Sequence, residues 1–312
     1  MTKKILILGG SGYIGARLTS LLSQKYQDIT ILDLEIDSKL DKSKIKVINL
    51  DITKESVIDE ITDQYYDVVI NLISLDHNKS QNYKPLIVNN INVLPTWNLL
   101  NSFSRKSNLK KFINFSTIHV YSNFTKENQI TEESEVNPSS IYGMTHLISE
   151  NITNYFNSNS KICSINLRLS NSYGEPYLKN KDCWNLVINN LCLNAFKYGE
   201  IKLKSNLQNT RNFIHYLDIF QAVELLIDSK STKYNTYNLC NDKSISFEEL
   251  IKIIEDQYEL IFDKKLVVSV LNEPLKIQNS NYSNLRLKKL NFENKLSIEN
   301  GINKMFYHLK DD

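Results

Sequence analysis

Residues 5–15 read Ile-Leu-Ile-Leu-Gly-Gly-Ser-Gly-Tyr-Ile-Gly, a short apolar run that leads through a glycine-rich turn into a helix-period segment. Four of the chain's eight glycines fall in this stretch. A strand, a glycine turn and a helix in this order are typical of a dinucleotide-binding Rossmann unit, here with the spacing GxxGxxG. Gly9 would permit the tight turn, Gly12 the approach of the pyrophosphate, and Gly15 the close packing of helix on strand. We expect the phosphates at the helix N-terminus, where backbone N–H groups favour anions.

An acidic residue, Asp33, follows Gly15 at the end of the next apolar run, Ile29–Leu32. A carboxylate there can hydrogen-bond a ribose 2′-hydroxyl and would repel a 2′-phosphate, so the sequence predicts NAD as the cofactor rather than NADP. Asp51, after a third apolar run, is predicted to contact the adenine ring or to be an ordinary loop residue. Further predicted cofactor-binding residues lie in the glycine turn or near later strand ends: Tyr13, Ile14, Ile52, Leu72, Ile73 and Asn92.

Apolar runs of strand length alternate with helix-period segments through the first half of the chain. The runs are Ile5–Leu8, Ile29–Leu32, Ile45–Ile48, Val68–Ile73, Phe112–Phe115 and Ile162–Leu167. The helical segments include Tyr13–Lys25, Lys54–Thr62, Leu86–Phe103 and Ser140–Phe156. This alternation predicts an α/β fold with a doubly wound parallel Rossmann sheet. It weakens after residue 168, so we expect an NAD-binding domain over 1–167, with a return segment near 212–240, and a smaller α/β substrate-binding portion over 168–312.

Composition excludes several classes of function. The net charge of +2 gives no strong field for nucleic acid or a membrane surface. No apolar run approaches about 18 residues, so no transmembrane helix is expected. The lysines and apolar residues at the start run directly into glycines and are read as a strand rather than a signal peptide. None of the four cysteines forms a CxxC pair or a zinc-like cluster, so we expect reduced thiols in a cytoplasmic protein without a metal.

Further motifs follow the glycine turn in a consistent order. They are Asn71-Leu-Ile-Ser; His77 with Pro85 and Asn92-Val93; Phe115-Ser-Thr-Ile-His-Val-Tyr121; Pro138-Ser-Ser-Ile-Tyr-Gly143; Arg168-Leu-Ser-Asn-Ser-Tyr-Gly174; and Arg211-Asn-Phe-Ile-His-Tyr-Leu-Asp218. Together they resemble the extended short-chain dehydrogenase/reductase family, which includes the NAD-dependent nucleotide-sugar epimerases and dehydratases. The resemblance covers nearly the whole chain and implies an enzyme that uses NAD on a nucleotide sugar.

The resemblance assigns two residues to proton transfer. Tyr142 matches the tyrosine that acts as general acid/base at the sugar carbon that loses or gains hydride. Thr117 matches the Ser/Thr that hydrogen-bonds the reacting oxygen. Because an alkoxide develops as hydride leaves, a proton acceptor and a donor to that oxygen lower the barrier. An unperturbed tyrosine titrates near 10, so a nearby cation is needed for it to act as a base at neutral pH.

The sequence departs from the family at that cation, because the Tyr-x-x-x-Lys pattern reads Tyr142-Gly-Met-Thr-His146. The i,i+4 spacing keeps His146 on the same helix face as Tyr142. Imidazole is shorter than lysine and mostly neutral at pH 7. Three interpretations stay open: His146 substitutes as a cation or proton relay, another group supplies the charge, or the protein binds NAD without efficient turnover.

His119 is a second departure. The sugar 4,6-dehydratases have Asp-Glu where this chain has Ile118 and His119, so the acid and base for water elimination are missing. This argues against a 4,6-dehydratase and against a decarboxylating relative with Glu at that position. His119 is predicted to be an additional catalytic acid/base, with packing beside the sheet as the alternative.

The resemblance also assigns substrate contacts. Asn171 and Arg211 match positions that hold the substrate diphosphate, and arginine suits phosphate because it binds bidentately. The alternatives are a loop-turn role for Asn171 and a surface salt bridge for Arg211. His77 is a further substrate-binding candidate. The segment Ser283–Phe292 departs from the family's C-terminal pattern, so the motifs do not specify the base, the sugar or the carbon.

The favoured hypothesis is an NAD-dependent nucleotide-sugar epimerase that works by transient oxidation. The alternatives are a nucleotide-ketosugar reductase that consumes NAD(P)H, and a non-catalytic NAD-binding scaffold or sensor. The resemblance further implies a homodimer in which the predicted helices Leu86–Phe103 and Ser140–Phe156 pair across the interface. An apolar helix face buried within its own domain is the alternative.

Overall fold

The computed structural model describes residues 3–121, 129–178, 183–230, 232–270 and 281–311. The chain forms two compact units. Unit 1 comprises Met1–Lys126, Glu132–Leu169 and Val223–Asn238, and unit 2 comprises Glu127–Thr131, Ser170–Ala222 and Leu239–Asp312. Among the described residues, no helix combines the length and apolar character that a membrane crossing requires.

Unit 1 is built on a seven-stranded sheet with the order β11-β6-β5-β4-β1-β2-β3. The pairings from β6 through to β3 are parallel. The strands are β1 (Lys4–Leu8), β2 (Asp28–Asp33), β3 (Lys46–Asn49), β4 (Tyr66–Asn71), β5 (Leu109–Thr117), β6 (Cys163–Leu169) and β11 (Thr236–Leu239). The predicted doubly wound parallel sheet is therefore confirmed.

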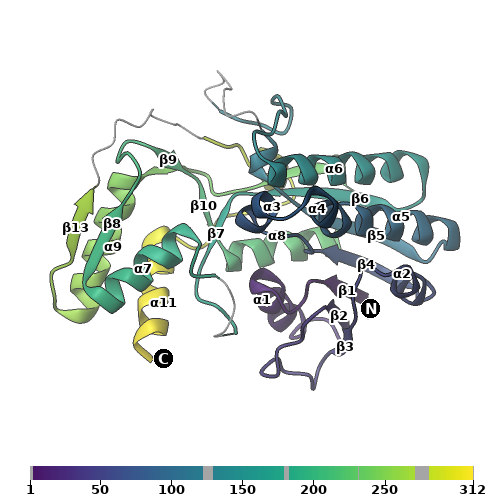
Figure 1. The fold of residues 1–312 in the computed structure, drawn as a ribbon, viewed down its shortest axis with the longest axis horizontal. Coiled ribbons are helices and arrows are strands. Elements are labelled where there is room, and N and C mark those ends of the chain that lie inside the picture. Colours follow the sequence, from purple (N-terminus) through teal and green to yellow (C-terminus); the bar gives the residue numbers. More distant parts are fainter. Residues whose placement is uncertain (1–2, 122–128, 179–182, 231, 271–280, 312) are drawn as a thin grey trace. The chain divides into compact units, whose positions relative to one another are not determined.

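Helices cover both faces of this sheet, which explains why its central strands are continuous apolar runs. The helices are α1 (Tyr13–Leu22), α2 (Glu55–Thr62), α3 (His77–Asn82), α4 (Pro85–Asn92), α5 (Leu94–Lys106) and α6 (Ile141–Asn159), with a 3-10 turn η1 (Ile118–Val120). Figure 1 shows α5 and α6 along one side of the sheet and α1 on the other. Leu6 and Leu8 of β1 pack with Phe103 of α5 and Phe156 of α6 in one core cluster.

Several predicted boundaries were wrong. The segment Leu86–Phe103 is not one helix, because the chain breaks at Val93 (φ −119°) between α4 and α5. Pro95 explains the break, since its nitrogen cannot donate the helical hydrogen bond. The strand predicted over Val68–Ile73 ends at Asn71, and the helix predicted over Tyr13–Lys25 ends at Leu22.

A row of buried asparagines crosses three adjacent strands of the sheet. Asn71, Asn114 and Asn166 are paired in register on β4, β5 and β6. Asn71 Nδ2 donates to Asn114 Oδ1 at 3.1 Å, and Asn114 Nδ2 donates to Asn166 Oδ1 at 3.1 Å. Thr96 of α5 accepts from Asn71, and Asn154 of α6 accepts from Asn166. The row therefore joins the strands to the two helices that cover them.

Unit 2 combines short strand pairs with helices. Its elements are β7 (Asn171–Tyr173), α7 (Val187–Tyr198), β8 (Glu200–Leu203), β9 (Thr210–Arg211), β10 (Phe213–His215), β12 (Ile245–Ser246), α9 (Phe247–Phe262), β13 (Val267–Val270), α10 (Leu285–Lys288) and α11 (Ile298–Asp311). Helix α8 (Tyr216–Asp228) begins in unit 2 and ends in unit 1. The core of unit 2 contains buried side chains from β7, α7, α9 and α11, including Tyr173, Ile188, Ile254 and Phe306.

Candidate functional site

The glycine turn after β1 forms a close contact between strand and helix. A Cβ atom on Gly15 would lie 2.0 Å from the carbonyl oxygen of Gly9, so α1 can pack here only because residue 15 has no side chain. Gly12 is the N-cap of α1 and has no side chain with which to cap that helix end. Tyr13 and Ile14 open the first turn of α1. The helix end therefore keeps the form in which backbone N–H groups can receive a phosphate.

Asp33 holds its carboxylate beside that turn. Its Oδ2 accepts from the Ser11 backbone N–H at 2.9 Å, and its Oδ1 accepts from Leu34 N–H at 2.8 Å. The side chain is half-buried at the last position of β2. A fixed negative charge here suits a ribose diol and disfavours a 2′-phosphate. The turn and Asp33 together fit a dinucleotide such as NAD.

Asp51 and Ile52 lie in the loop after β3. Asp51 Oδ1 accepts from Thr53 N–H at 3.0 Å and from Thr53 Oγ1 at 2.7 Å, an arrangement typical of a loop aspartate. Ile52 is buried in the core of unit 1. The structure thus gives both residues local structural contacts.

Asn92 braces the loop that follows β4. Its Oδ1 accepts from Leu75 N–H at 2.8 Å, and its Nδ2 donates to Thr145 Oγ1 of α6 at 3.0 Å. Leu72 and Ile73 lie in this loop, and Leu72 N–H donates to the Leu8 carbonyl. Asn92 therefore ties the loop to the helix that carries Tyr142.

The predicted catalytic residues come together at the carboxyl end of the sheet. Thr117 ends β5, His119 lies on η1, His77 begins α3, and Tyr142 and His146 occupy successive turns of α6. The Tyr142 ring centroid lies 4.5 Å from that of His146, 6.0 Å from His119 and 5.9 Å from His77. Three of the chain's five histidines thus surround one tyrosine.

Local geometry fixes the start of α6 against η1. Ser140 is the N-cap, and its hydroxyl accepts from Gly143 N–H at 3.1 Å. A Cβ atom on Gly143 would lie 2.2 Å from the His119 carbonyl oxygen. The glycine after Tyr142 therefore lets the first turn of α6 approach the η1 backbone, and this contact brings Tyr142 beside His119.

Tyr142 is a protonated phenol at neutral pH in this environment. Desolvation raises the pKa of Tyr142 to about 12, and the negative charge of Asp76 adds to the increase. A hydrogen bond with Thr117 opposes it. Thr117 therefore lies close enough to stabilise the ionised form of Tyr142, but the phenol keeps its proton at neutral pH.

His146 is uncharged at neutral pH. It is buried, and desolvation lowers the pKa of His146 to about 4, with repulsion from His119 as the second cause. A hydrogen bond to the Phe115 backbone opposes this decrease. His146 therefore does not provide the permanent positive charge that lysine would give beside Tyr142.

Ser74 is a site residue that the sequence prediction missed. Its Oγ lies 3.1 Å from His146 Nε2. Ser74 is the last residue of the Asn71-Leu-Ile-Ser motif and lies just after a strand end. Because ligands of parallel sheets bind at such ends, this position could have indicated a site residue from the sequence.

The two predicted phosphate-binding residues lie in unit 2. Asn171 on β7 is paired with Phe213, and its Nδ2 donates to the Asn212 carbonyl at 2.8 Å. Arg211 is half-buried, with its guanidinium 5.5 Å from the Phe247 ring centroid. Desolvation lowers the pKa of Arg211. No carboxylate in the described ranges forms an ion pair with Arg211, so a salt bridge does not account for it.

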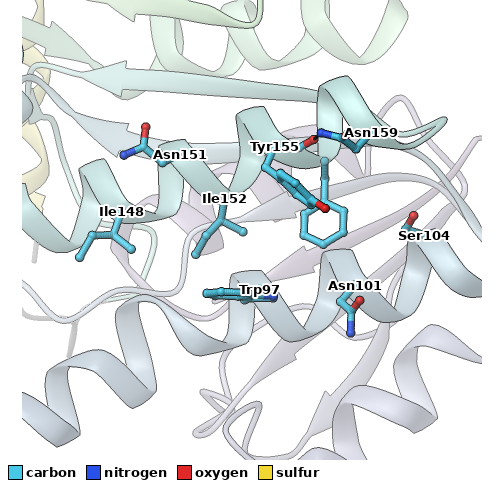
Figure 2. Close-up of a pocket in the computed structure, with 9 residues that line it drawn as sticks. Trp97, Asn101, Ser104, Ile148, Asn151, Ile152, Tyr155 and Asn159 are labelled. Carbon is cyan, nitrogen blue, oxygen red and sulfur yellow. Dashed lines mark hydrogen bonds between the residues drawn. The ribbon is translucent and has the colours of Figure 1, made fainter.

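A second feature of unit 1 is a groove of about 640 Å³ between α5 and α6. Figure 2 shows Trp97 on α5 facing Ile148, Ile152 and Tyr155 on α6. Trp97 and Tyr155 are 53% and 61% exposed, which is unusual for large aromatic side chains. Within the described residues, no cluster of three or more His, Cys, Asp or Glu could hold a metal ion.

Comparison with known proteins gives consistent matches. The sequence profile of the NAD dependent epimerase/dehydratase family matches residues 5–240. The chain is 25% identical to dTDP-D-glucose 4,6-dehydratase of Dictyostelium discoideum, over 99% of this chain and 82% of that protein. It is 24% identical to a putative UDP-glucose 4-epimerase of Methanocaldococcus jannaschii, over 99% of both chains. The solved UDP-N-acetylglucosamine 4-epimerase of Methanobrevibacter ruminantium has a similar fold, with a TM-score of 0.86, 20% identity and 99% of each chain covered.

Proposed function

Because this chain belongs to the NAD-dependent epimerase/dehydratase family, we propose that it is a nucleotide-sugar epimerase that works by transient oxidation of a sugar hydroxyl. The observation that carries the proposal is the position of Tyr142 at the carboxyl end of the sheet, near Thr117 and with the rings of His77, His119 and His146 around it. Ligands of doubly wound sheets bind at that end.

NAD, the cofactor of this family, would be held by the turn Gly9–Gly15, the N-terminus of α1 and the carboxylate of Asp33. When bound, it supplies an acceptor for hydride from the sugar carbon and returns that hydride. The chain's own residues must hold the sugar and move the hydroxyl proton. Tyr142 Oη carries that proton, and Thr117 Oγ1 hydrogen-bonds the reacting oxygen.

The protonation state of Tyr142 separates the two halves of the reaction. A phenol that is protonated at neutral pH donates its proton readily to the alkoxide formed when a ketone is reduced. The oxidation half requires the phenol to lose its proton first. We therefore expect oxidation to be the slower half and to accelerate as the pH rises.

The same observation favours a second candidate, a nucleotide-ketosugar reductase that consumes NADH or NADPH. Such an enzyme uses Tyr142 only as a proton donor, the role that the phenol holds at neutral pH. Net consumption of reduced cofactor identifies this activity, whereas an epimerase consumes none.

A 4,6-dehydratase is not proposed, although dTDP-D-glucose 4,6-dehydratase and two trifunctional enzymes named as UDP-glucose 4,6-dehydratases are among the similar proteins. Water elimination needs an acid and a base beside the reacting sugar, and the pair that serves there in dehydratases is replaced by Ile118 and His119. Ile118 is buried and has no proton to exchange, whereas His119 is exposed beside Tyr142 and is proposed as an additional acid/base.

We further propose that Asn171 and Arg211 bind the substrate diphosphate and that His77 contacts the sugar. A half-buried guanidinium without an ion-pair partner in the described residues gains most from a phosphate. His77 lies with His119 and Tyr142 in one ring cluster.

The groove between α5 and α6 supports a homodimer. Residues 85–104 contain no charged side chain, and Glu150, the charged carboxylate of α6, is buried. Leu86, Trp97, Met144 and Tyr155 are all more than 45% exposed on these helices. An uncharged face with exposed aromatic residues is typical of a protein interface. Light scattering should give twice the mass of one chain, and Trp97→Glu should reduce it to that of a monomer.

The test of the proposed function is proton NMR of UDP-, GDP-, dTDP- and CDP-linked hexoses with protein and NAD. A new anomeric signal that Tyr142→Phe abolishes would establish an epimerase and identify its substrate. His146→Lys should increase the rate at neutral pH, because a cation beside Tyr142 lowers its pKa. NAD binding without conversion of any sugar, and without NADH consumption on ketosugars, would instead indicate a scaffold or sensor.

A further inference from the structure

The ring of His146 has a hydrogen-bond partner at Nε2. Ser74 Oγ lies 3.1 Å from this nitrogen, and the nearby Phe115 backbone favours the protonated ring. Only 7% of His146 is exposed, so water cannot easily replace these partners. Any change in its charge must therefore be accommodated by Ser74 and Phe115.

Counting protons shows that these partners suit both charge states. A neutral ring that carries its proton on Nδ1 leaves Nε2 as an acceptor, and the Ser74 hydroxyl can donate to it. A protonated ring donates from both nitrogens, so Ser74 Oγ accepts from Nε2 and turns its own proton to the Leu75 carbonyl, 2.9 Å away. The Leu75 carbonyl keeps a donor in the neutral state, because Ser80 Oγ lies 3.2 Å from it. Rotation of one hydroxyl thus connects two states in which Nε2 of His146 and the Leu75 carbonyl both have hydrogen-bond partners.

The other groups around His146 do not replace Ser74. In the part of the chain that the structure describes, the hydrogen-bond partner of Nε2 is Ser74 Oγ. Helices α4 and α5 contribute no charged residue between 85 and 104. The titratable and charged groups on the elements around it are Tyr142 and Glu150 on α6, Arg168 on β6, His119 on η1, His77 and Lys79 on α3, and Asp76 at the N-cap of α3. Glu150 is paired with Arg168 at 2.7 Å and Asp76 with Lys79 at 3.4 Å, which leaves His77, His119 and Tyr142 to act on the ring.

We propose that Ser74 is a positioning residue for His146. The Ser74 hydroxyl donates to Nε2 when the ring is neutral and accepts from Nε2 when the ring is protonated. The functional meaning rests on the proposed function, since His146 stands where the family has its lysine beside Tyr142. Ser74 lets a buried histidine gain a proton there at no loss of hydrogen bonds, so the remaining cost is desolvation and repulsion from His119.

The test is nitrogen-15 NMR of the histidine side chains in the whole protein. At pH 7, His146 should show a protonated Nδ1 and an accepting Nε2. Ser74→Ala should move the Nε2 resonance toward that of an unbonded nitrogen and lower the His146 pKa by about one pH unit, which corresponds to about 1.4 kcal/mol. Ser74→Thr, which keeps the hydroxyl, should restore both values. Ser80→Ala is the matched control and should leave the Nε2 resonance in place.

The inference would be overturned if Ser74→Ala changed neither the Nε2 resonance nor the pKa of His146. If Ser74→Ala does not fold, Ser74→Cys gives the same test with a smaller shift, because a thiol is a weaker donor and acceptor. The measurement needs no substrate. A shifted His146 in a protein that converts no sugar would refute the proposed function alone, whereas turnover with an unshifted His146 would refute this inference alone. In an active enzyme, Ser74→Ala should also displace the pH profile of kcat toward lower pH.

Discussion

His146→Gln should make the protein more resistant to acid. The buried imidazole of the wild type has a pKa of about 4, compared with the ordinary value of 6.5. The neutral form is therefore favoured in the folded state, and the unfolded chain binds more protons between these two pH values. It follows that the wild type loses stability as the pH falls from about 6.5 toward 4. Glutamine keeps a polar amide at this position but does not titrate, so the variant should not share this loss.

The size of the effect follows from the shift in pKa. At 1.36 kcal/mol for each pKa unit, the contribution amounts to roughly 3 kcal/mol when fully developed and to about 2 kcal/mol between pH 7 and pH 5. Urea unfolding at pH 7 and pH 5, followed by circular dichroism, measures it directly. The wild type should lose about 2 kcal/mol more than His146→Gln over this interval. Carboxylates titrate in both proteins and cancel in the difference.

His308→Gln, on α11 in unit 2, is the matched control because it removes a histidine outside the cluster. Comparison of the two variants between pH 7 and pH 5 shows whether the reduced loss is specific to His146. If His146→Gln and the wild type lost the same amount, His146 would not be a buried neutral imidazole. Tyr142 could then have a cation beside it at neutral pH, and oxidation need not be the slower half of the reaction.

Three further outcomes are expected. Glu150→Gln should lower the free energy of unfolding by about 3–5 kcal/mol in urea titrations, because it leaves the buried Arg168 without its carboxylate. The double variant Glu150→Leu with Arg168→Met should recover much of that loss. A loss below about 1 kcal/mol in Glu150→Gln would contradict the buried pair. Gly15→Ala should weaken NAD binding at least roughly tenfold by calorimetry, since its Cβ would lie 2.0 Å from the Gly9 carbonyl oxygen, and an unchanged Kd would show that the turn does not hold the cofactor. Asp33→Asn should raise the affinity for NADP relative to NAD by about tenfold, because one repulsive charge is removed. An unchanged ratio of the two affinities would show that Asp33 does not contact the adenosine ribose.

The sheet could be predicted because its strands are covered on both faces. Such strands appear as apolar runs, as in Ile5–Leu8, and the glycine turn fixed where the first one ends. Prediction was wrong where the local pattern was ambiguous. Pro95 interrupts a segment whose apolar periodicity otherwise continues, and α3, over His77–Asn82, was not predicted because it contains no apolar residue to give a period.

The candidate site divides in the same way. Thr117, Tyr142 and His146 belong to local motifs, so the sequence could nominate them. That His77 and His119 reach Tyr142 depends on how α3 and η1 pack against α6, which no local pattern encodes. The pairing of Ser74 with His146 joins positions 72 residues apart and is likewise a product of folding. The neutral state of His146 follows from burial, which a spacing of four residues cannot reveal.

The asparagine row across β4, β5 and β6 has a consequence for how the chain avoids misalignment. Strands rich in isoleucine and valine can slide past one another with little change in apolar contact, because every position looks alike. A shift of even one residue would bury three amide groups without partners, and each would cost about 1–3 kcal/mol. The hydrogen bonds among Asn71, Asn114 and Asn166 thus favour a single register of the three strands. The site at the strand ends inherits that alignment, because Thr117 lies three residues beyond Asn114 on β5.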